Sequence, residues 1–194
     1  GDPMAIKPGE RRTQILEPLA GMLEQPRAAR IPTAALAAKM QFSEAALYRH
    51  FASKAQMFEG LIEFIETTIF TLVNQIIAAE PQGLAQARRI AAMLLAFSER
   101  NRGMTRLLTG DALVTEDDRL QARINHIHDR IEASFRQALR VAVEDGSLAR
   151  DTDVAARASL LMHWVLGRWL RYTQSGWTIP PTGHLDEQLR VALG

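Results

Sequence analysis

Apolar residues recur at intervals of three and four along most of the chain, the spacing that places them on one face of an α-helix. The clearest stripes predict two long helices, over 117–144 and 151–174. No polar/apolar alternation typical of a strand is visible, so the pattern predicts an all-α protein. Shorter stripes predict the remaining helices, over 10–24, 33–39, 43–50, 53–80, 84–99 and 104–108, with a short one near the C-terminus.

Polar and conformationally special residues delimit these helices. Ser43 and Ser53 are predicted N-caps, because a serine hydroxyl accepts a hydrogen bond from an unpaired donor of the first helical turn. Gly146 is expected to end the 117–144 helix in a left-handed conformation. Pro18 lies inside the first stripe and removes a backbone donor, so we expect that helix to start later or to kink.

Composition and charge narrow the class of protein without identifying a partner. The chain of 194 residues is 47% hydrophobic and contains no Cys, which excludes disulfides and favours a reducing cytoplasm. No apolar run approaches the roughly 20 residues that span a bilayer. The net charge is only +1, but from Met4 to Lys54 eight basic residues stand against four acidic ones. That local excess suits a phosphate backbone.

The segment 33–54 has the features of a helix-turn-helix. Two short helices flank a tight turn at 40–42, and a longer helix precedes them. The second short helix is thin at Ala45 and Ala46, whose methyls can approach thymine methyls in a major groove about 12 Å wide. Arg49 can reach a phosphate or a guanine edge. Polar tips suited to phosphate oxygens follow at Tyr48, His50 and Lys54.

Spacing alone equally allows a capped surface helix here, but the order of residues is more specific. Ser43-Glu44-Ala45-Ala46-Leu47-Tyr48-Arg49-His50-Phe51, followed by Ser53-Lys54, resembles the TetR-family signature of a recognition helix that closes in Tyr-x-His-Phe. The resemblance implies a homodimer that reads palindromic double-stranded DNA. It implies DNA contacts from Thr33, Ser43, Glu44, Ala45, Ala46, Tyr48, Arg49, His50 and Lys54.

The same resemblance implies a division of the chain into domains. Residues 1–8 are expected to be a disordered N-terminus that carries a tag remnant ahead of Met4. A helix-turn-helix DNA-binding domain is expected over 9–54 and a helical regulatory and dimerisation domain over 55–194. The two long helices would form the dimer, with Leu161, Val165 and Trp169 at the interface.

Stretches beyond the head resemble the nucleoid-occlusion factors of the SlmA group within this family. They read Leu61-Ile62-Glu63-Phe64-Ile65-Glu66, Glu99-Arg100-Asn101, Thr105-Arg106-Leu107-Leu108-Thr109-Gly110 and Asp118-Arg119-Leu120-Gln121-Ala122-Arg123-Ile124-Asn125. This resemblance implies a nucleoid-associated factor without a cofactor, which on DNA inhibits ring assembly by the tubulin-like division protein FtsZ. It implies a partner surface at Phe64, Met93, Ala96, Arg100 and Asn101.

The pattern of the residues gives that surface a plainer interpretation. Phe64 and Met93 fall at the helical spacing of core residues, and Arg100-Asn101 suits a helix C-terminus. Four residues also depart from the pattern of the group and bear on individual contacts. Pro32 replaces a capping Thr, Ala35 a Lys, Gln41 a turn Gly and Leu72 an Arg on the partner face.

A ligand-responsive repressor of the TetR type is the alternative function. It would hold a small molecule between the 84–99 helix and the final pair of helices. A Met/Trp stripe at helical spacing is, however, more typical of core or dimer packing than of a pocket. The residues that would line the pocket are Met162, His163, Trp164 and Trp169.

An enzyme is not indicated. The acidic run Glu116-Asp117-Asp118 suits the positive end of a helix dipole without any catalytic role. His126 and His128 are two residues apart and point to different faces of a helix, so they do not readily share a metal ion. The sequence contains neither a phosphate-binding Gly loop nor a nucleophile elbow.

Overall fold

A computed structural model describes residues 8–24, 33–39 and 43–194 of the chain. Within these ranges every regular element is helical, so the all-α prediction is confirmed. The predicted break at 25–30, the turn at 40–42, Pro32, Gln41 and residues 1–7 lie outside the described residues. The elements are α1 (Pro8–Leu23), α2 (Thr33–Lys39), α3 (Glu44–His50), α4 (Lys54–Ala79), α5 (Gly83–Arg100), α6 (Arg102–Leu108), a 3-10 helix η1 (Asp111–Leu113), α7 (Asp118–Glu144), α8 (Val154–Gln174) and α9 (Leu185–Leu193).

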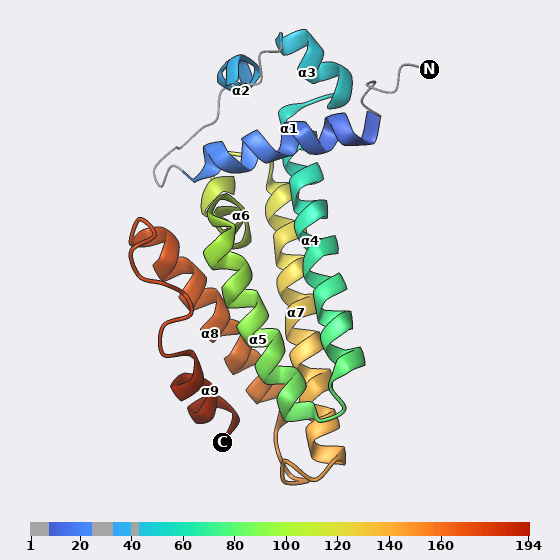
Figure 1. Cartoon of the computed structure of the whole chain (residues 1–194), viewed down its shortest axis with the longest axis vertical. Helices are drawn as coiled ribbons and strands as arrows, with labels where there is room; N and C mark the ends of the chain where they lie inside the picture. Colours follow the sequence, from blue (N-terminus) through green and yellow to red (C-terminus); the bar gives the residue numbers. More distant parts are fainter. Residues whose placement is uncertain (1–7, 25–32, 40–42) are drawn as a thin grey trace.

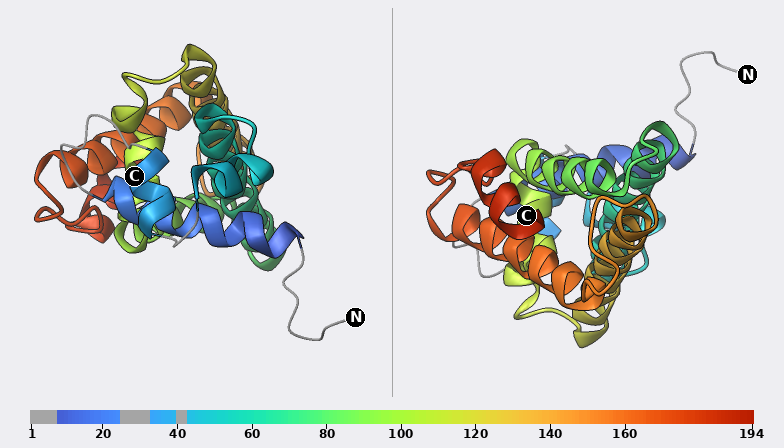
Figure 2. Two further views of the ribbon diagram at one scale, coloured as in Figure 1. Left: turned by 90° about the horizontal axis from the view of Figure 1, so that it is seen from above. Right: turned by 90° about the horizontal axis from the view of Figure 1, so that it is seen from below.

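The helices form an elongated bundle with a small head at one end. Helices α4, α5 and α7 run along the long axis, α8 packs against α5 and α7, and α9 lies near the opposite end from the head (Figure 1). Helix α1 lies across the upper end of the bundle, where it contacts α4 and α6. Helices α2 and α3 lie beyond α1, which Figure 2 shows from above. The orientation of the head therefore depends on how α1 is held.

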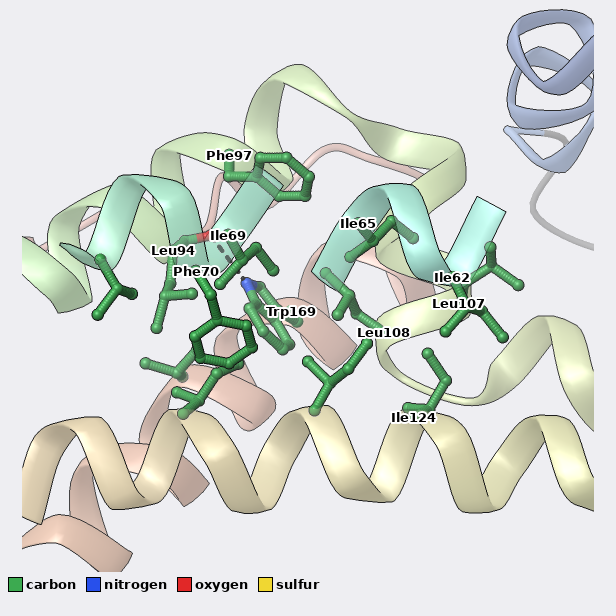
Figure 3. Packing of buried hydrophobic residues seen from close by; sticks show 14 of the residues in the cluster. Ile62, Ile65, Ile69, Phe70, Leu94, Phe97, Leu107, Leu108, Ile124 and Trp169 are labelled. Carbon is green, nitrogen blue, oxygen red and sulfur yellow. Dashed lines mark hydrogen bonds between the residues drawn. The ribbon is translucent and has the colours of Figure 1, made fainter. Parts of the chain in front are cut away.

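The core runs the length of the bundle. Helix α7 turns its predicted apolar stripe inward, with Leu120, Ile131 and Phe135 all fully buried. Trp169 of α8 is fully buried among residues of α4, α5 and α6 (Figure 3). Its indole Nε1 donates a hydrogen bond to the carbonyl oxygen of Leu94 at 3.1 Å. A large ring with its only polar atom paired is a stable way to fill such a space.

The helix ends follow most of the sequence predictions. The Oγ atoms of Ser43 and Ser53 accept hydrogen bonds from the first turns of α3 and α4, at 3.1 and 3.2 Å. Gly146 has φ 85° and ends α7 as predicted. Pro18 neither delays nor interrupts α1, which is helical from Pro8 to Leu23.

The expectation that no apolar run is long enough to span a bilayer needs a correction at α4. By length and composition alone this helix could cross a membrane. Core helices of soluble proteins have the same composition, and α4 packs against α5 and α7. Its buried residues include Leu61, Ile65, Ile69 and Val73.

Gly103 sets the closest approach between the head and the bundle. It lies in the first turn of α6, and a Cβ atom on it would lie 1.9 Å from the carbonyl oxygen of Ala20 in α1. Atoms do not approach so closely, so only glycine allows the two helices to pack at this distance. The contact fixes the middle of α1 against α6.

Candidate functional site

Helix α3 has one buried side and one open side. Leu47 is fully buried, and Phe51 just beyond the helix is 1% exposed. Ala45, Tyr48 and Arg49 lie exposed on the opposite face, with Tyr48 42% exposed. Ala46 and His50 are half-buried at the edges of that face. A short helix with small residues and polar tips on its open side can enter a major groove.

The starts of α2 and α3 are tied together by residues predicted to contact DNA. The hydroxyl of Thr33 donates a hydrogen bond to Glu44 Oε2 at 3.3 Å. Ser43 uses its hydroxyl to cap α3 through the amide of Ala46. The first bond joins the two helices, and the second fixes the start of α3. Ala35, where the family pattern has a Lys, lies exposed on α2.

Lys54 is engaged by an acidic residue from a distant part of the chain. Its Nζ lies 2.8 Å from Oε1 of Glu116, and the two side chains are 23% and 12% exposed. The acidic run 116–118 lies at a helix start as predicted, with Asp117 as the N-cap of α7, while the Glu116 side chain turns to Lys54. Since Glu116 is 62 residues away, no local pattern could have revealed this pair.

A groove opens next to the head, between α1, α4 and the junction of α5 and α6. Its volume is about 540 Å³. Phe64 is 44% exposed there, so the pattern-based expectation that it belongs to the core is wrong. Asn101 donates from Nδ2 to the carbonyl oxygen of Phe97 at 2.8 Å, in keeping with a helix C-terminus. The groove is lined by Leu16, Glu17, Ala20, Gly21, Glu24, Leu61, Phe64, Arg100, Asn101, Arg102, Gly103 and Met104.

A second hollow of about 470 Å³ lies further along α4 and α5. It contains Met93, which is half-buried, and Leu72, the residue that stands where the family pattern has an Arg. Ala96 is half-buried on α5, between Met93 and Arg100 in sequence. The structure thus places all the predicted partner residues along one side of the α4–α5 pair.

Comparison with known proteins identifies the family. A family model for the N-terminal domain of bacterial regulatory proteins of the tetR family matches residues 29–61. The SlmA-like model, described as the tetracyclin repressor-like C-terminal domain, matches residues 81–193. The nucleoid occlusion factor SlmA of Alteromonas mediterranea is 47% identical over 184 residues, covering 95% of this chain and 94% of the relative. That of Aliivibrio fischeri strain ES114 is 48% identical over 178 residues, with 91% of each chain covered.

The chain belongs to the SlmA family. It is a nucleoid occlusion factor of the TetR type, with a DNA-binding head. Solved structures with low identity share its fold. The fatty acid degradation regulator FadR of Bacillus halodurans has a TM-score of 0.79 at 12% identity, with 97% of each chain covered. A CifR mutant in complex with operator DNA has a TM-score of 0.73 at 18% identity, covering 100% of this chain and 98% of CifR.

A ligand-responsive repressor of the TetR type would hold its ligand inside the bundle. The four residues that the sequence assigned to such a pocket do not converge. Met162 and Trp169 are core residues, and His163 is exposed on α8. Trp164 is half-buried and donates from Nε1 to Oε1 of Gln188 at 2.6 Å. Core side chains occupy this region.

The predicted dimer-interface residues of this SlmA-family chain need correction. Leu161, Val165 and Trp169 have no exposed surface in the protomer, because α5 and α7 already cover them. A side chain without exposed surface adds no contact area to a partner. Among the exposed residues of α8, four form a stripe at helical spacing: Leu160, His163, Gly167 and Leu170.

The two histidines of α7 have separate surroundings. His126 is exposed, and its Nε2 lies 4.0 Å from Oε1 of Glu66. His128 is largely buried, with Nε2 2.6 Å from the carbonyl oxygen of Leu108, and burial lowers its pKa below the usual value. Across the described ranges, no group of three His, Cys, Asp or Glu side chains could hold a metal ion.

Replacing Glu116 by Gln is expected to tighten DNA binding about three- to tenfold at low salt. The Lys54 ammonium would lose its carboxylate partner and become available to a phosphate, and one negative charge near the head would disappear. Fluorescence anisotropy with a labelled duplex over a KCl series measures the effect. Asp117→Asn removes the same charge one residue later, from a carboxylate paired with Arg119, and should change affinity much less. Weaker binding by Glu116→Gln would show that the pair holds Lys54 in its DNA-contacting position.

Proposed function

We propose that this protein binds palindromic chromosomal DNA as a homodimer and there inhibits FtsZ ring assembly. The observation that carries the proposal is the open groove beside the DNA-binding head of a SlmA-family chain. The head comprises α1–α3 and the body begins near Lys54, the first residue of α4. The protein would act in the cytoplasm, on the nucleoid, and needs no cofactor for this role.

DNA recognition is assigned to the open face of α3 and its surroundings. Ala45 and Ala46 allow close approach to the bases, and Arg49 supplies a base-edge or phosphate contact. Phosphate contacts, which position the head without reading sequence, come from polar groups around it. These are Thr33, Ser43, Tyr48, His50 and Lys54. Glu44 contributes indirectly, because its carboxylate accepts the hydrogen bond from Thr33 and so positions the start of α2.

The groove suits an apolar segment that carries a carboxylate at the Arg100 end, since Glu17 and Glu24 make its α1 side acidic. Phe64 exposes nearly half of its surface there, and large exposed aromatic residues are enriched where proteins bind one another. Arg100 is exposed at the same edge and can pair with a carboxylate. FtsZ is the partner that the SlmA resemblance implies, with Met93, Ala96 and Asn101 extending the surface along α5.

Dimerisation is assigned to α7 and α8, the two long C-terminal helices. The stripe Leu160, His163, Gly167 and Leu170 is the contact surface on α8, because Leu160 is 55% and Leu170 38% exposed in the protomer. A symmetric dimer places the same stripe on both partners. Two heads then face two half-sites that are about one helical turn apart.

A chromosome-wide map of bound sites in the protein's own cells tests the proposal. Many dispersed palindromes that are absent around the replication terminus are expected for a nucleoid occlusion factor. Occupancy of only one or two promoters would overturn the proposal and indicate a conventional ligand-responsive repressor. The map depends on DNA binding alone, so it does not test FtsZ binding.

Arg100→Asp is expected to weaken FtsZ binding at least about 30-fold and to leave DNA affinity unchanged. A carboxylate in place of the guanidinium at the groove would repel an acidic partner, and like charges at an interface cost several kcal/mol. Co-sedimentation with FtsZ polymers and anisotropy with a palindromic duplex measure the two activities. Arg190→Asp makes the same charge change at an exposed position of α9, a helix that does not line the groove and is not assigned to the dimer. Equal loss in both variants, or loss of DNA binding in Arg100→Asp, contradicts the assignment.

A further inference from the structure

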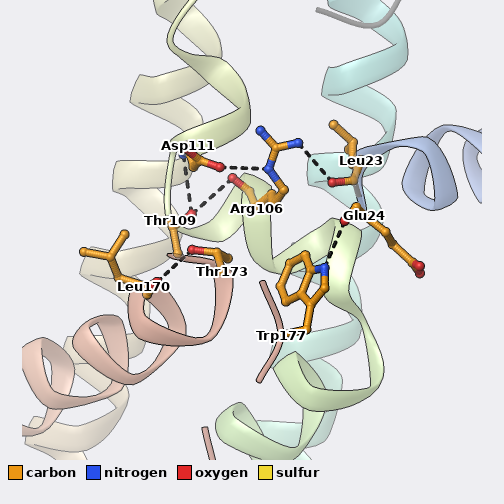
Figure 4. Close-up of polar contacts among 8 residues, drawn as sticks. All are labelled: Leu23, Glu24, Arg106, Thr109, Asp111, Leu170, Thr173 and Trp177. Atoms are coloured by element: carbon orange, nitrogen blue, oxygen red, sulfur yellow. Dashed lines mark hydrogen bonds and ion pairs between the residues drawn. The ribbon is translucent and has the colours of Figure 1, made fainter. Parts of the chain in front are cut away.

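The C-terminal end of α1 is held by two side chains from the body. The last carbonyl groups of a helix have no partner within the helix, so solvent, a local cap or another side chain must satisfy them. Arg106 of α6, 3% exposed, donates from Nη1 to the carbonyl oxygen of Leu23 at 3.1 Å. Trp177, in the loop between α8 and α9, donates from Nε1 to the carbonyl oxygen of Glu24 at 2.9 Å. Figure 4 shows both donors reaching α1.

Trp177 adopts an unfavourable backbone conformation that contacts with neighbouring side chains stabilise. Its φ is 69°, a left-handed value that is rare for a bulky residue and persists only where surrounding contacts compensate. Its amide donates to the carbonyl oxygen of Tyr172 in the turn that ends α8. The two rings meet edge to face with centroids 4.9 Å apart, and the Arg102 guanidinium lies over the indole at 5.9 Å.

These neighbours are themselves anchored to the body. The hydroxyl of Tyr172 accepts a hydrogen bond from Nε of Arg102 at 3.1 Å and donates one to the carbonyl oxygen of Glu99 at 3.1 Å. The indole therefore belongs to a cluster that joins the end of α8 to the junction of α5 and α6. The cluster reaches across 153 residues to the end of α1.

Helix α1 carries the rest of the head. Its core residues Ile15 and Leu19 are buried in the same cluster as Leu36 of α2 and Leu47 of α3, and α1 contacts both short helices. A tilt of α1 would therefore move the recognition helix as a unit. In a dimer, the separation of the two recognition helices is then set by the angle at which each body holds its α1.

We propose that Trp177 is a positioning residue that fixes the end of α1 and thereby sets the spacing of DNA half-sites that the dimer accepts. This inference rests on the proposed binding of palindromic DNA by a dimer. Arg106 fixes the preceding carbonyl in the same way, and Gly103 fixes the middle of the helix. Trp177 contributes no base or phosphate contact of its own in this arrangement; it acts through α1.

Trp177→Phe tests the proposal, because it retains an aromatic ring against Tyr172 while it removes the indole donor together with one ring of the indole. The probes are a palindromic duplex selected from a random pool by the wild-type protein and versions with one base pair added or removed between the half-sites. Wild-type protein is expected to prefer the selected spacing. In Trp177→Phe that preference should fall about three- to tenfold, the loss that corresponds to one hydrogen bond. Hydrogen exchange of the last-turn amides of α1 should also become faster.

Trp164→Phe is the matched control, since it also removes an indole hydrogen bond, here to Gln188 of α9, without touching α1. It should keep both the spacing preference and the slow exchange of α1. Unchanged spacing preference in Trp177→Phe, even with a lower melting temperature, overturns the proposal and makes the contact merely structural. If the wild-type protein shows no preference for any palindrome, the proposed dimeric DNA binding fails, whatever the exchange data show for the end of α1.

Discussion

Gly103→Ala is expected to lower the affinity for a palindromic duplex at least about tenfold and to reduce the free energy of unfolding by about 1–3 kcal/mol. The added Cβ would lie 1.9 Å from the carbonyl oxygen of Ala20 and 2.8 Å from its carbonyl carbon. The obstacle is backbone on both sides, which no rotamer change removes. Helix α1 would have to move by about 1 Å or more relative to α6 to restore an ordinary contact.

DNA affinity should suffer more than stability in this variant. Alanine favours the helical conformation of α6 by about 1 kcal/mol over glycine, which offsets part of the strain. Helix propensity does not restore DNA affinity, because α2 and α3 move with α1 when it shifts. Anisotropy with the palindromic duplex and urea unfolding followed by circular dichroism measure the two effects.

Gly60→Ala is the matched control for this prediction. Its added Cβ would lie 3.1 Å from a ring carbon of Phe51 and 3.5 Å from Leu16, so it meets side chains rather than backbone and a shift of a few tenths of an ångström relieves the contact. Helix propensity in α4 then offsets the small strain, and the free energy of unfolding should change by less than about 1 kcal/mol. Wild-type DNA binding by Gly103→Ala would show that α1 and α6 separate without consequence for the head.

Trp169→Ala is expected to reduce the free energy of unfolding by about 3–5 kcal/mol, the range for deleting a fully buried large ring. The side chain has no exposed surface and is surrounded by residues of α4, α5 and α6. Its loss would leave a cavity and remove the donor to the carbonyl oxygen of Leu94. Since whole domains are stable by only about 5–15 kcal/mol, this is a large fraction of the total.

Trp169→Phe separates packing from hydrogen bonding in that measurement. It keeps much of the ring volume and should cost about 1–3 kcal/mol, from the lost donor and the smaller ring. Unfolding must be compared at one protein concentration, because dimerisation adds to the apparent stability. A loss below about 1 kcal/mol for Trp169→Ala would mean that the body is loosely packed there and could accommodate a ligand.

The sequence by itself determined where the helices lie and where most of them end. Helical periodicity and capping are local properties, so α7 begins and ends within one residue of its prediction and Ser43 and Ser53 cap the predicted helices. The order of residues from Ser43 to Phe51 was equally informative about family, since a recognition helix must combine a buried side with a thin, polar outer side. Of the two outcomes expected at Pro18, the later helix start is wrong, because α1 is helical from Pro8 to Leu23.

Only the tertiary structure decided which surface covers each apolar face. An apolar stripe shows that a face avoids water but not what covers it, so Leu161, Val165 and Trp169 could not be assigned to core or dimer from spacing. Phe64 keeps core spacing yet lies open, because no helix in the described part of the chain closes the groove over it. The pairs Lys54–Glu116 and Trp177–Glu24 join residues 62 and 153 positions apart. Contacts over such separations depend on how whole helices pack, and no local pattern encodes them.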